Sequence, residues 1–322
     1  NGWVEHDPIE IMQTVKSTIT TIFERNKIIQ NDILSCGITN QRETIVAWDK
    51  VTGKPLYNAI VWQDRRTQNI CQDLVDKDYT NLIQEKTGLI IDPYFSASKI
   101  QWLLENIKDQ NNLIIGTIDT WIIWNLSNKT KHLTDITNAS RTMLYNIADE
   151  VWDHEILDLF NISESILPTV QSNKDDFGTI HSDHFGIEIP IGGVIGDQQS
   201  ASLGQLCVKK GMIKATYGTG CFVLINTDEN KTKSKNKLLT TIASKVDDKK
   251  QYAVEGSIFN AGTVVQWLRD EMKLFKDVSE IESLIQNSKN DITFIPAFTG
   301  LGAPYWKSDT RGTIYGITRD TS

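Results

Sequence analysis

Apolar residues along this chain recur with two different periods. In the first stretch they lie three and four positions apart, the spacing of a helix that buries one face. Asp7 and Pro8 stand directly before it, where a helix has its cap and its first-turn proline. The apolar positions are Ile11, Met12, Val15, Ile19, Ile22 and Phe23. We therefore predict a helix from residue 8 onward that packs on a sheet.

Short apolar runs bounded by turn residues predict the strands of that sheet. These runs lie at residues 33–38, 44–49, 58–63 and 189–196, and two more flank a Gly-Thr-Gly turn at 218–220. Helical periodicity returns at residues 96–109, 200–207 and 261–275, and residues 116–126 resemble a buried strand-helix unit. Strands that alternate with helices in this way predict an α/β fold.

Composition narrows the possible partners. The 322 residues include 33 Lys+Arg and 41 Asp+Glu, a net charge of −8, so the chain lacks the basic excess that nucleic-acid binding requires. Its uncharged apolar runs are too short to span a bilayer, and the N-terminus has no signal-peptide pattern. We expect a cytoplasmic protein of two domains, with neither nucleic acid nor membrane as a partner.

Candidate metal ligands are scattered along the chain. The four cysteines have no C-x-x-C spacing, and His181 and His184 have no third ligand at zinc spacing. We therefore expect reduced cysteines and no metal held by protein side chains alone.

Eight motifs, in order along the chain, resemble those of glycerol kinases, which belong to the carbohydrate kinases related to hexokinase and actin. They are GITNQRET, IVWQDRRT, DPYFSASK, DTWIIW, TNASRTML, GDQQSA, YGTGCF and QWLRDEMK. The resemblance implies a two-lobed, actin/hexokinase-like (ribonuclease H-like) α/β fold. Residues 1–199 would form the polyol-binding first lobe, and residues 200–322 the start of the nucleotide-binding second lobe. The fold would be incomplete at both ends, because the family's Asp-x-Gly-Thr phosphate loop and its adenosine-binding segment have no counterpart here.

The same resemblance implies transfer of a phosphoryl group from ATP, with Mg²⁺, to glycerol. The product would be glycerol 3-phosphate, and the enzyme would be a homodimer or a higher homo-oligomer. Two alternatives stay open. One is a kinase of the same family that acts on a pentulose or a longer polyol, and the other is a polyol-binding protein without catalysis.

Asp197 directly follows the apolar run 189–196 and is the candidate general base. A carboxylate at the carboxyl end of a buried strand lies where open α/β sheets bind ligands, and it can accept the proton of a bound hydroxyl. The pattern alone favours an N-cap of the next helix. The resemblance favours the base, and the two roles are compatible.

Arg42 and Glu43 are candidates for binding neighbouring hydroxyls of a small polyol, with Gln198 completing the contacts. Adjacent residues in a strand point to opposite faces, so both can reach one ligand only where the strand has ended or bulged. From the residues alone, an exposed Arg/Glu pair is the simpler interpretation. Their role as substrate ligands comes from the resemblance.

The resemblance also implies an aromatic wall of Trp62, Tyr94 and Phe222 against the carbon atoms of the polyol. The Tyr94 hydroxyl would add a hydrogen-bonding group. Aromatic residues in strands are otherwise core residues. The bulk of Trp62 and Phe222 argues for a short substrate.

Gly218, Thr219 and Gly220 are candidates for holding phosphate. Glycines let backbone N–H groups approach anionic oxygens, and the Thr219 hydroxyl adds a donor. Hairpin turns use glycine in the same way, so the motif alone is weak. Gly262 could let a helix N-terminus approach the nucleotide, with Gln266 one turn later. Gln266 also suits an ordinary exposed helix position.

Overall fold

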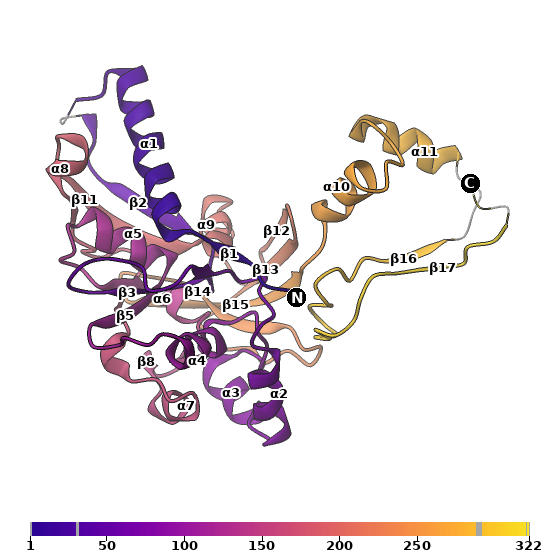
Figure 1. The fold of residues 1–322 in the computed structure, drawn as a ribbon, viewed down its shortest axis with the longest axis horizontal. Coiled ribbons are helices and arrows are strands. Elements are labelled where there is room, and N and C mark those ends of the chain that lie inside the picture. The colour runs from indigo at the N-terminus through magenta and orange to yellow at the C-terminus, as the bar shows by residue number, and fades with distance from the viewer. Residues whose placement is uncertain (1, 30–31, 288–291, 320, 322) are drawn as a thin grey trace.

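Three sheets form the centre of the molecule, and they bring together strands from distant parts of the chain (Figure 1). The computed structural model describes residues 2–29, 32–287, 292–319 and 321. The first sheet has the order β1-β4-β3-β5, and its neighbouring strands are antiparallel. Its strands are β1 (Glu5–His6), β3 (Ile45–Asp49), β4 (Ala59–Ile60) and β5 (Leu113–Thr117).

The second sheet positions the candidate base. Its order is β10-β11-β2, with β11 parallel to β2 and antiparallel to β10. The register aligns Gly196 with Asn40, so β11 and β2 end at the same edge. The strands are β2 (Cys36–Asn40), β10 (Thr179–Ile180) and β11 (Ile189–Gly196).

The third sheet is antiparallel, consists of later residues and has the order β12-β13-β15-β14, so β15 lies between β13 and β14. Its strands are β12 (Ile213–Tyr217), β13 (Cys221–Asp228), β14 (Leu239–Val246) and β15 (Lys249–Ile258). Three two-stranded pairs complete the strands: β6 (Leu133–Asp135) with β9 (Thr169–Gln171), β7 (Tyr145–Asn146) with β8 (Val151–Trp152), and β16 (Thr293–Ile295) with β17 (Thr313–Tyr315).

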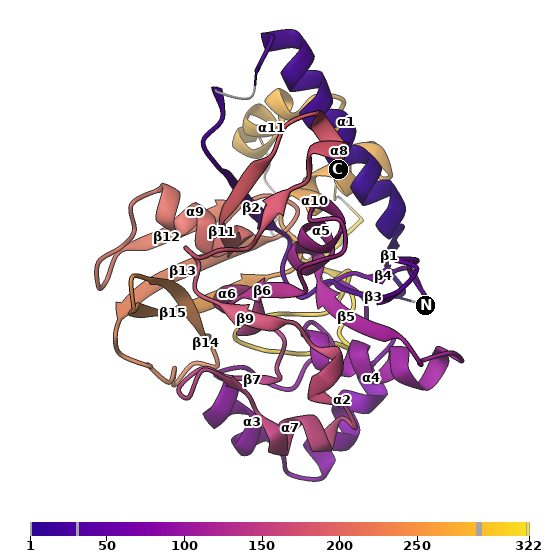
Figure 2. The same cartoon turned by 90° about the vertical axis from the view of Figure 1, so that its left-hand side faces the viewer.

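The helices cover these sheets or connect them. Figure 2 shows α1 and α5 beside the β10-β11-β2 sheet, and Figure 1 shows α10, α11 and the β16–β17 pair projecting from the rest of the chain. The helices are α1 (Pro8–Asn26), α2 (Gln68–Asp76), α3 (Thr80–Thr87), α4 (Ser96–Asn106), α5 (Ile118–Leu126), α6 (Ile136–Ala139), α7 (His154–Leu159), α8 (Ser182–Phe185), α9 (Asp197–Gly204), α10 (Gly262–Asp270) and α11 (Ile281–Asn287). None of the described helices is both long and apolar enough to span a membrane.

The predicted start of the first helix is confirmed. Asp7 is the N-cap of α1, and its Oδ1 accepts a hydrogen bond of 2.8 Å from the backbone N–H of Ile9. Pro8 occupies the first turn, where its missing N–H costs nothing. The helix ends where Lys27 adopts a left-handed conformation with φ of 53°.

The predicted strands are present, but several boundaries differ. The run predicted at 33–38 is a strand at Cys36–Asn40, and the run at 58–63 keeps only Ala59–Ile60. The helix predicted at 200–207 begins earlier, at Asp197, and ends at Gly204. Hydrophobic runs mark where a segment is buried, whereas hydrogen-bond partners decide where a strand or helix ends.

The largest hydrophobic cluster joins the third sheet to the earlier part of the chain. Leu239 and Ile242 of β14 are fully buried in it, together with Ile45 of β3 and Phe95 before α4. A second cluster lies between α1, α5 and the β10-β11-β2 sheet and contains Trp48 and Trp121. The third sheet therefore shares its core with residues of the first 200.

We predict that Ile242→Ala lowers the free energy of unfolding by about 2–5 kcal/mol, because it leaves a cavity inside this shared cluster. Urea unfolding followed by tryptophan fluorescence measures the loss. Ile213→Ala is the matched control, since Ile213 is 59% exposed and should change stability by less than about 0.5 kcal/mol. Equal losses in both variants would contradict a core shared across the chain.

Candidate active site

The candidate base stands where β11 turns directly into α9. Gly196 is extended and is the N-cap of the helix, and Asp197 is the first helical residue. The sequence-based N-cap assignment of Asp197 is therefore wrong by one position. The Asp197 Oδ1 accepts a hydrogen bond of 2.7 Å from the backbone N–H of Gln198, and its side chain is 41% exposed.

Arg42 lies next to this carboxylate because β2 ends beside β11. Its Nε is 3.2 Å from Asp197 Oδ1. The close packing needs glycine at position 196, since a Cβ there would lie 2.7 Å from Arg42 Cγ. The parallel register thus brings residues from two strand ends to one point.

Arg42 and Glu43 lie in a turn rather than in a strand. β2 ends at Asn40, β3 begins at Ile45, and Glu43 has a φ of 62°. The left-handed residue breaks the alternation of faces, so both side chains point into the same region. The expectation that the strand has ended before both side chains can face one ligand is confirmed. Both residues are 2% exposed, which excludes the alternative of an exposed ion pair.

A network of four buried charges surrounds this turn. Arg42 donates to both oxygens of Glu255 in β15, at 2.6 Å and 3.2 Å. Arg141, which follows α6, donates from Nη2 to Glu255 Oε1 at 2.9 Å and from Nε to Glu43 Oε1 at 2.6 Å. We call Arg42, Glu43, Arg141 and Glu255 the four-charge cluster.

The cluster shifts the ionisation of its two glutamates in opposite directions. Burial on its own would raise the pKa of Glu255, but attraction to Arg141 and Arg42 outweighs burial and lowers this pKa to about 2. At Glu43, burial is the stronger influence and the pKa is raised despite both arginines. Glu255 is therefore the firmly ionised member that neutralises the arginines.

The two glutamines after Asp197 are hydrogen-bonded to different parts of the site. Gln198 donates from Nε2 to Asp197 Oδ2 at 3.3 Å, and its Oε1 accepts from Lys214 of β12. Gln199, for which the sequence predicts no role, accepts from Arg42 Nη1 at 3.1 Å and donates to the Ile242 carbonyl at 3.2 Å. Gln199 therefore links the Arg42 turn to β14.

The three predicted wall residues meet. The ring of Trp62 lies 5.7 Å from that of Tyr94 and 5.8 Å from that of Phe222, both in edge-on geometry. Phe259, which the sequence did not single out, lies 5.5 Å from Tyr94 and 6.5 Å from Trp62. Tyr94 and Phe222 are buried, whereas Trp62 is partly exposed. Burial raises the pKa of the Tyr94 phenol, so this hydroxyl stays protonated and can donate.

The Gly-Thr-Gly turn packs on the start of α10. The Gly262 N–H donates to the Gly218 carbonyl at 2.8 Å, and the Thr263 hydroxyl donates to the Thr219 carbonyl at 3.1 Å. A Cβ at Gly262 would lie 2.6 Å from that Gly218 oxygen. Gly262 thus permits close contact between the turn and the helix, and its own N–H is already occupied by the turn.

The remaining phosphate candidates differ in exposure. Gly218 and Thr219 are exposed, and Gly220 is buried beside Phe222, whose Cε2 a Cβ at Gly220 would approach to 3.2 Å. The turn therefore adjoins the aromatic wall. Gln266 is exposed on α10, one turn beyond Gly262. The structure brings Gly218, Thr219, Gly220 and Gly262 together and leaves Gln266 at the periphery.

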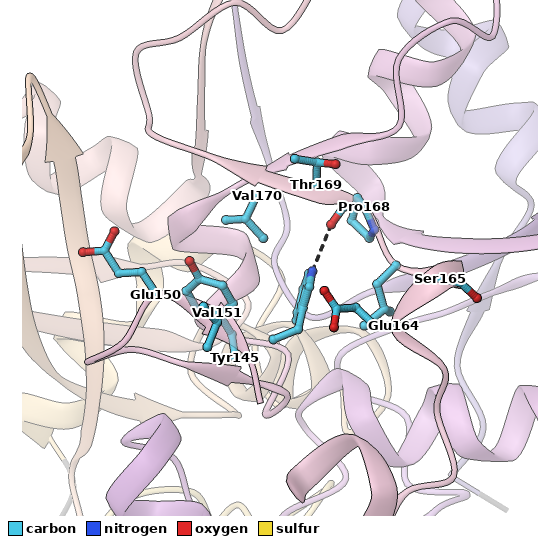
Figure 3. Close-up of a pocket in the computed structure, with 10 residues that line it drawn as sticks. Tyr145, Glu150, Val151, Glu164, Ser165, Pro168, Thr169 and Val170 are labelled. Atoms are coloured by element: carbon cyan, nitrogen blue, oxygen red, sulfur yellow. Dashed lines mark hydrogen bonds between the residues drawn. The ribbon is translucent and has the colours of Figure 1, made fainter. Parts of the chain in front are cut away.

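A separate cavity of about 510 Å³ lies away from these residues, beside the β7–β8 pair. Figure 3 shows it with the side chains of Tyr145, Glu150 and Glu164 around it, and its dashed line is the 3.0 Å hydrogen bond from Trp152 Nε1 to the Pro168 carbonyl. The residues that line the cavity are Tyr145, Glu150, Val151, Trp152, Glu164, Ser165, Leu167, Pro168, Thr169 and Val170. The candidate site residues do not line this cavity, so the cavity is separate from the candidate site.

Comparisons with known proteins establish the family of the chain. Residues 1–204 match the N-terminal domain of the FGGY family of carbohydrate kinases, and residues 213–322 match the C-terminal domain of that family. The chain belongs to the FGGY family of carbohydrate kinases. The predicted actin/hexokinase-like α/β fold is therefore confirmed.

Among curated relatives, this FGGY chain is 52% identical to "Glycerol kinase" of Alteromonas mediterranea over 330 residues, which cover 100% of the chain and 67% of the relative. It is 51% identical to "Glycerol kinase" of Rhizobium meliloti over 329 residues, covering 100% of the chain and 66% of the relative. The chain thus spans about two thirds of the length of the curated relatives that it matches.

Solved structures give the same result for the FGGY fold. The glycerol kinase of Plasmodium falciparum with ADP superposes with a TM-score of 0.86 at 46% identity, covering 100% of this chain and 66% of that one. A ligand-bound xylulose kinase from Lactobacillus acidophilus superposes with a TM-score of 0.82 at 23% identity, over 100% of this chain and 66% of that one. At that identity the second structure supports the fold alone.

We predict that Glu255→Gln lowers the free energy of unfolding by about 3–5 kcal/mol at pH 7, because it removes the buried carboxylate that Arg42 and Arg141 share. The pKa of Glu255 is about 2, below its ordinary value, so its stabilising effect is complete above about pH 5 and is lost as the pH falls toward 2. The difference between variant and wild type should narrow over that range.

Urea unfolding at pH 7, 5 and 3 measures this difference. Glu24→Gln is the control, because Glu24 is exposed on α1 and its loss should change stability by less than about 0.5 kcal/mol at each pH. A Glu255→Gln difference that stays constant from pH 7 to pH 3 would contradict the ionised role of Glu255.

Proposed function

We propose that this chain is part of an ATP:glycerol phosphotransferase that produces glycerol 3-phosphate. The observation that carries the proposal is the partly exposed Asp197 carboxylate, held between buried Arg42 and Gln198 at the end of β11. Relatives that are 51–52% identical and bear the name glycerol kinase support the substrate. The proposal includes a boundary between the two lobes near residue 199.

Glycerol would bind between the Arg42 turn and the aromatic wall. Glu43 can accept a hydrogen bond from one hydroxyl, and Gln198 lies beside Asp197 to contact another. Trp62 and Phe222, whose rings are 5.8 Å apart, would pack on the carbon atoms and restrict the length of the substrate. The four-charge cluster would keep Arg42 and Glu43 fixed before the substrate arrives.

Asp197 would act as the general base in the transfer. As the glycerol oxygen bonds to the γ-phosphorus, its proton passes to the Asp197 carboxylate, and ADP leaves with the electron pair of the broken P–O bond. The hydrogen bonds to Asp197 fix its orientation, which matters because catalysis here is mainly positioning and charge stabilisation.

The phosphates of ATP would lie at the Gly-Thr-Gly turn. The exposed Thr219 hydroxyl can donate to them, and Gly218 lets the backbone come close. Gly262 would act indirectly, by holding the turn against α10. Magnesium enters as part of the MgATP substrate, and the described residues contain no group of three or more His, Cys, Asp or Glu able to hold a metal ion.

We predict that Asp197→Asn abolishes glycerol-dependent ADP production, with a loss of at least about 10²–10⁴-fold, because the amide cannot accept the proton. Glycerol binding measured by calorimetry should change by less than about tenfold, since the transition-state role alone is lost. Both assays use protein expressed from its complete coding sequence. Near-normal turnover in Asp197→Asn would show that another group is the base.

A control variant tests whether the loss is specific to Asp197, and two comparison substrates test the assignment of glycerol. Asp158→Asn alters an exposed aspartate of α7 and should keep full turnover. Xylulose and ribulose are compared with glycerol as substrates, because the family also contains kinases of larger substrates. Faster turnover with either sugar would replace glycerol, and no turnover with any of the three would favour a binding protein without catalysis.

Two further predictions come from the sequence and accompany this proposal. The protein would be a homodimer or a higher homo-oligomer, which light scattering on the purified protein tests. It would also be located in the cytoplasm, which cell fractionation tests.

A further inference from the structure

Lys214 is a buried lysine on the strand that leads to the Gly-Thr-Gly turn. Along β12, Ile213, Ala215 and Tyr217 are exposed, whereas Lys214 is 4% exposed on the opposite face. A buried ammonium group is costly unless it is hydrogen-bonded, and burial lowers the pKa of Lys214. A lysine that lies inward on an otherwise exposed edge strand therefore calls for a functional explanation.

The partner of Lys214 is a neutral amide. Its Nζ donates to Gln198 Oε1, and no ion pair of Lys214 within 4.0 Å occurs in the described parts of the chain. A lysine can only donate, so the amide must turn its oxygen toward Lys214. Its Nε2 then faces the other way, 3.3 Å from Asp197 Oδ2. The lysine thus sets the direction of the hydrogen bond that reaches the carboxylate.

The charges around Lys214 come from several elements. Glu255 of β15 and Asp197 of α9 attract its ammonium group, while Arg42 repels it, and Cys221 of β13 is also nearby. Arg42 is already bonded to both oxygens of Glu255. Lys214 is therefore hydrogen-bonded to Gln198 and lies near enough to the four-charge cluster to be attracted by Glu255 and repelled by Arg42.

We propose that Lys214 is a positioning residue that fixes the Gln198 amide and, through it, the Asp197 carboxylate. The inference rests on the proposed role of Asp197 as the general base. It also gives β12 two tasks, because the strand that carries Lys214 ends at Tyr217 and leads directly into the turn at Gly218. The orientation of the base is then tied to the strand that presents the phosphate turn.

The test is a double-mutant cycle on kcat and KM for glycerol, in protein expressed from its complete coding sequence. Lys214→Met should lower kcat about 10–100-fold and change KM by less than about threefold, because it misorients the base without removing a substrate contact. The double variant Lys214→Met/Gln198→Ala should be no slower than Gln198→Ala alone, because Lys214 acts through Gln198.

The control is Lys210→Met, which removes an exposed lysine shortly before β12 and should leave kcat unchanged. Lys214→Arg keeps a donor at the position and should recover most of the kcat lost in Lys214→Met. If thermal unfolding shows that Lys214→Met does not fold, Lys214→Ala, which also lacks a donor, takes its place in the cycle, with the same expected outcomes.

Three results would overturn the inference. If the losses of the two single variants multiply in the double variant, Lys214 does not act through Gln198. If Lys214→Met raises KM with kcat unchanged, it contributes to substrate binding and not to base orientation. If the wild type shows no turnover with glycerol, xylulose or ribulose, the proposed function fails and this inference fails with it. If the wild type is active and either of the first two results is found, the inference about Lys214 alone is wrong.

Discussion

The bidentate ion pair between Arg42 and Glu255 is the interaction on which the rest of the site depends. Both side chains are almost entirely buried, and charges in such surroundings are tolerated only when they are paired and hydrogen-bonded. The pair joins the turn after β2 to β15. Its two residues are 213 positions apart in the sequence. Arg141 and Glu43 complete the neutralisation. The β10-β11-β2 sheet and the third sheet are thereby fixed in one relative position.

One arginine serves two carboxylates with different environments. Glu255 is fully buried and accepts hydrogen bonds on both oxygens, so it stays ionised and is shielded from solvent. Asp197 is partly exposed and meets the same arginine through Nε alone. Environments that differ in this way suit two acids on one arginine to different tasks, Glu255 to stability and Asp197 to the proposed role of general base.

Much of the site could be predicted from local patterns. The strand ends before Arg42 and Asp197, the Gly-Thr-Gly turn and the meeting of Trp62 with Phe222 follow from short motifs and from the resemblance that they carry. The periodic pattern places the start of α9 three residues too late, at residue 200. The cap of α9 is misassigned by one residue, because a residue at the end of a strand suits either the cap or the first helical position.

The partners of these residues could not be predicted, because pairing between distant segments leaves no periodic signal. At Lys214 the local pattern is misleading, because the apolar Ile213, Ala215 and Tyr217 that alternate with it are the exposed residues of β12. Nothing local names Arg42 as the partner of Glu255 or Gln198 as the partner of Lys214. The contact between Gly262 and Gly218 has a mechanical consequence as well. Because the first residue of α10 is hydrogen-bonded to the turn, the turn sets the direction in which α10 leaves it toward the projecting segment seen in Figure 1.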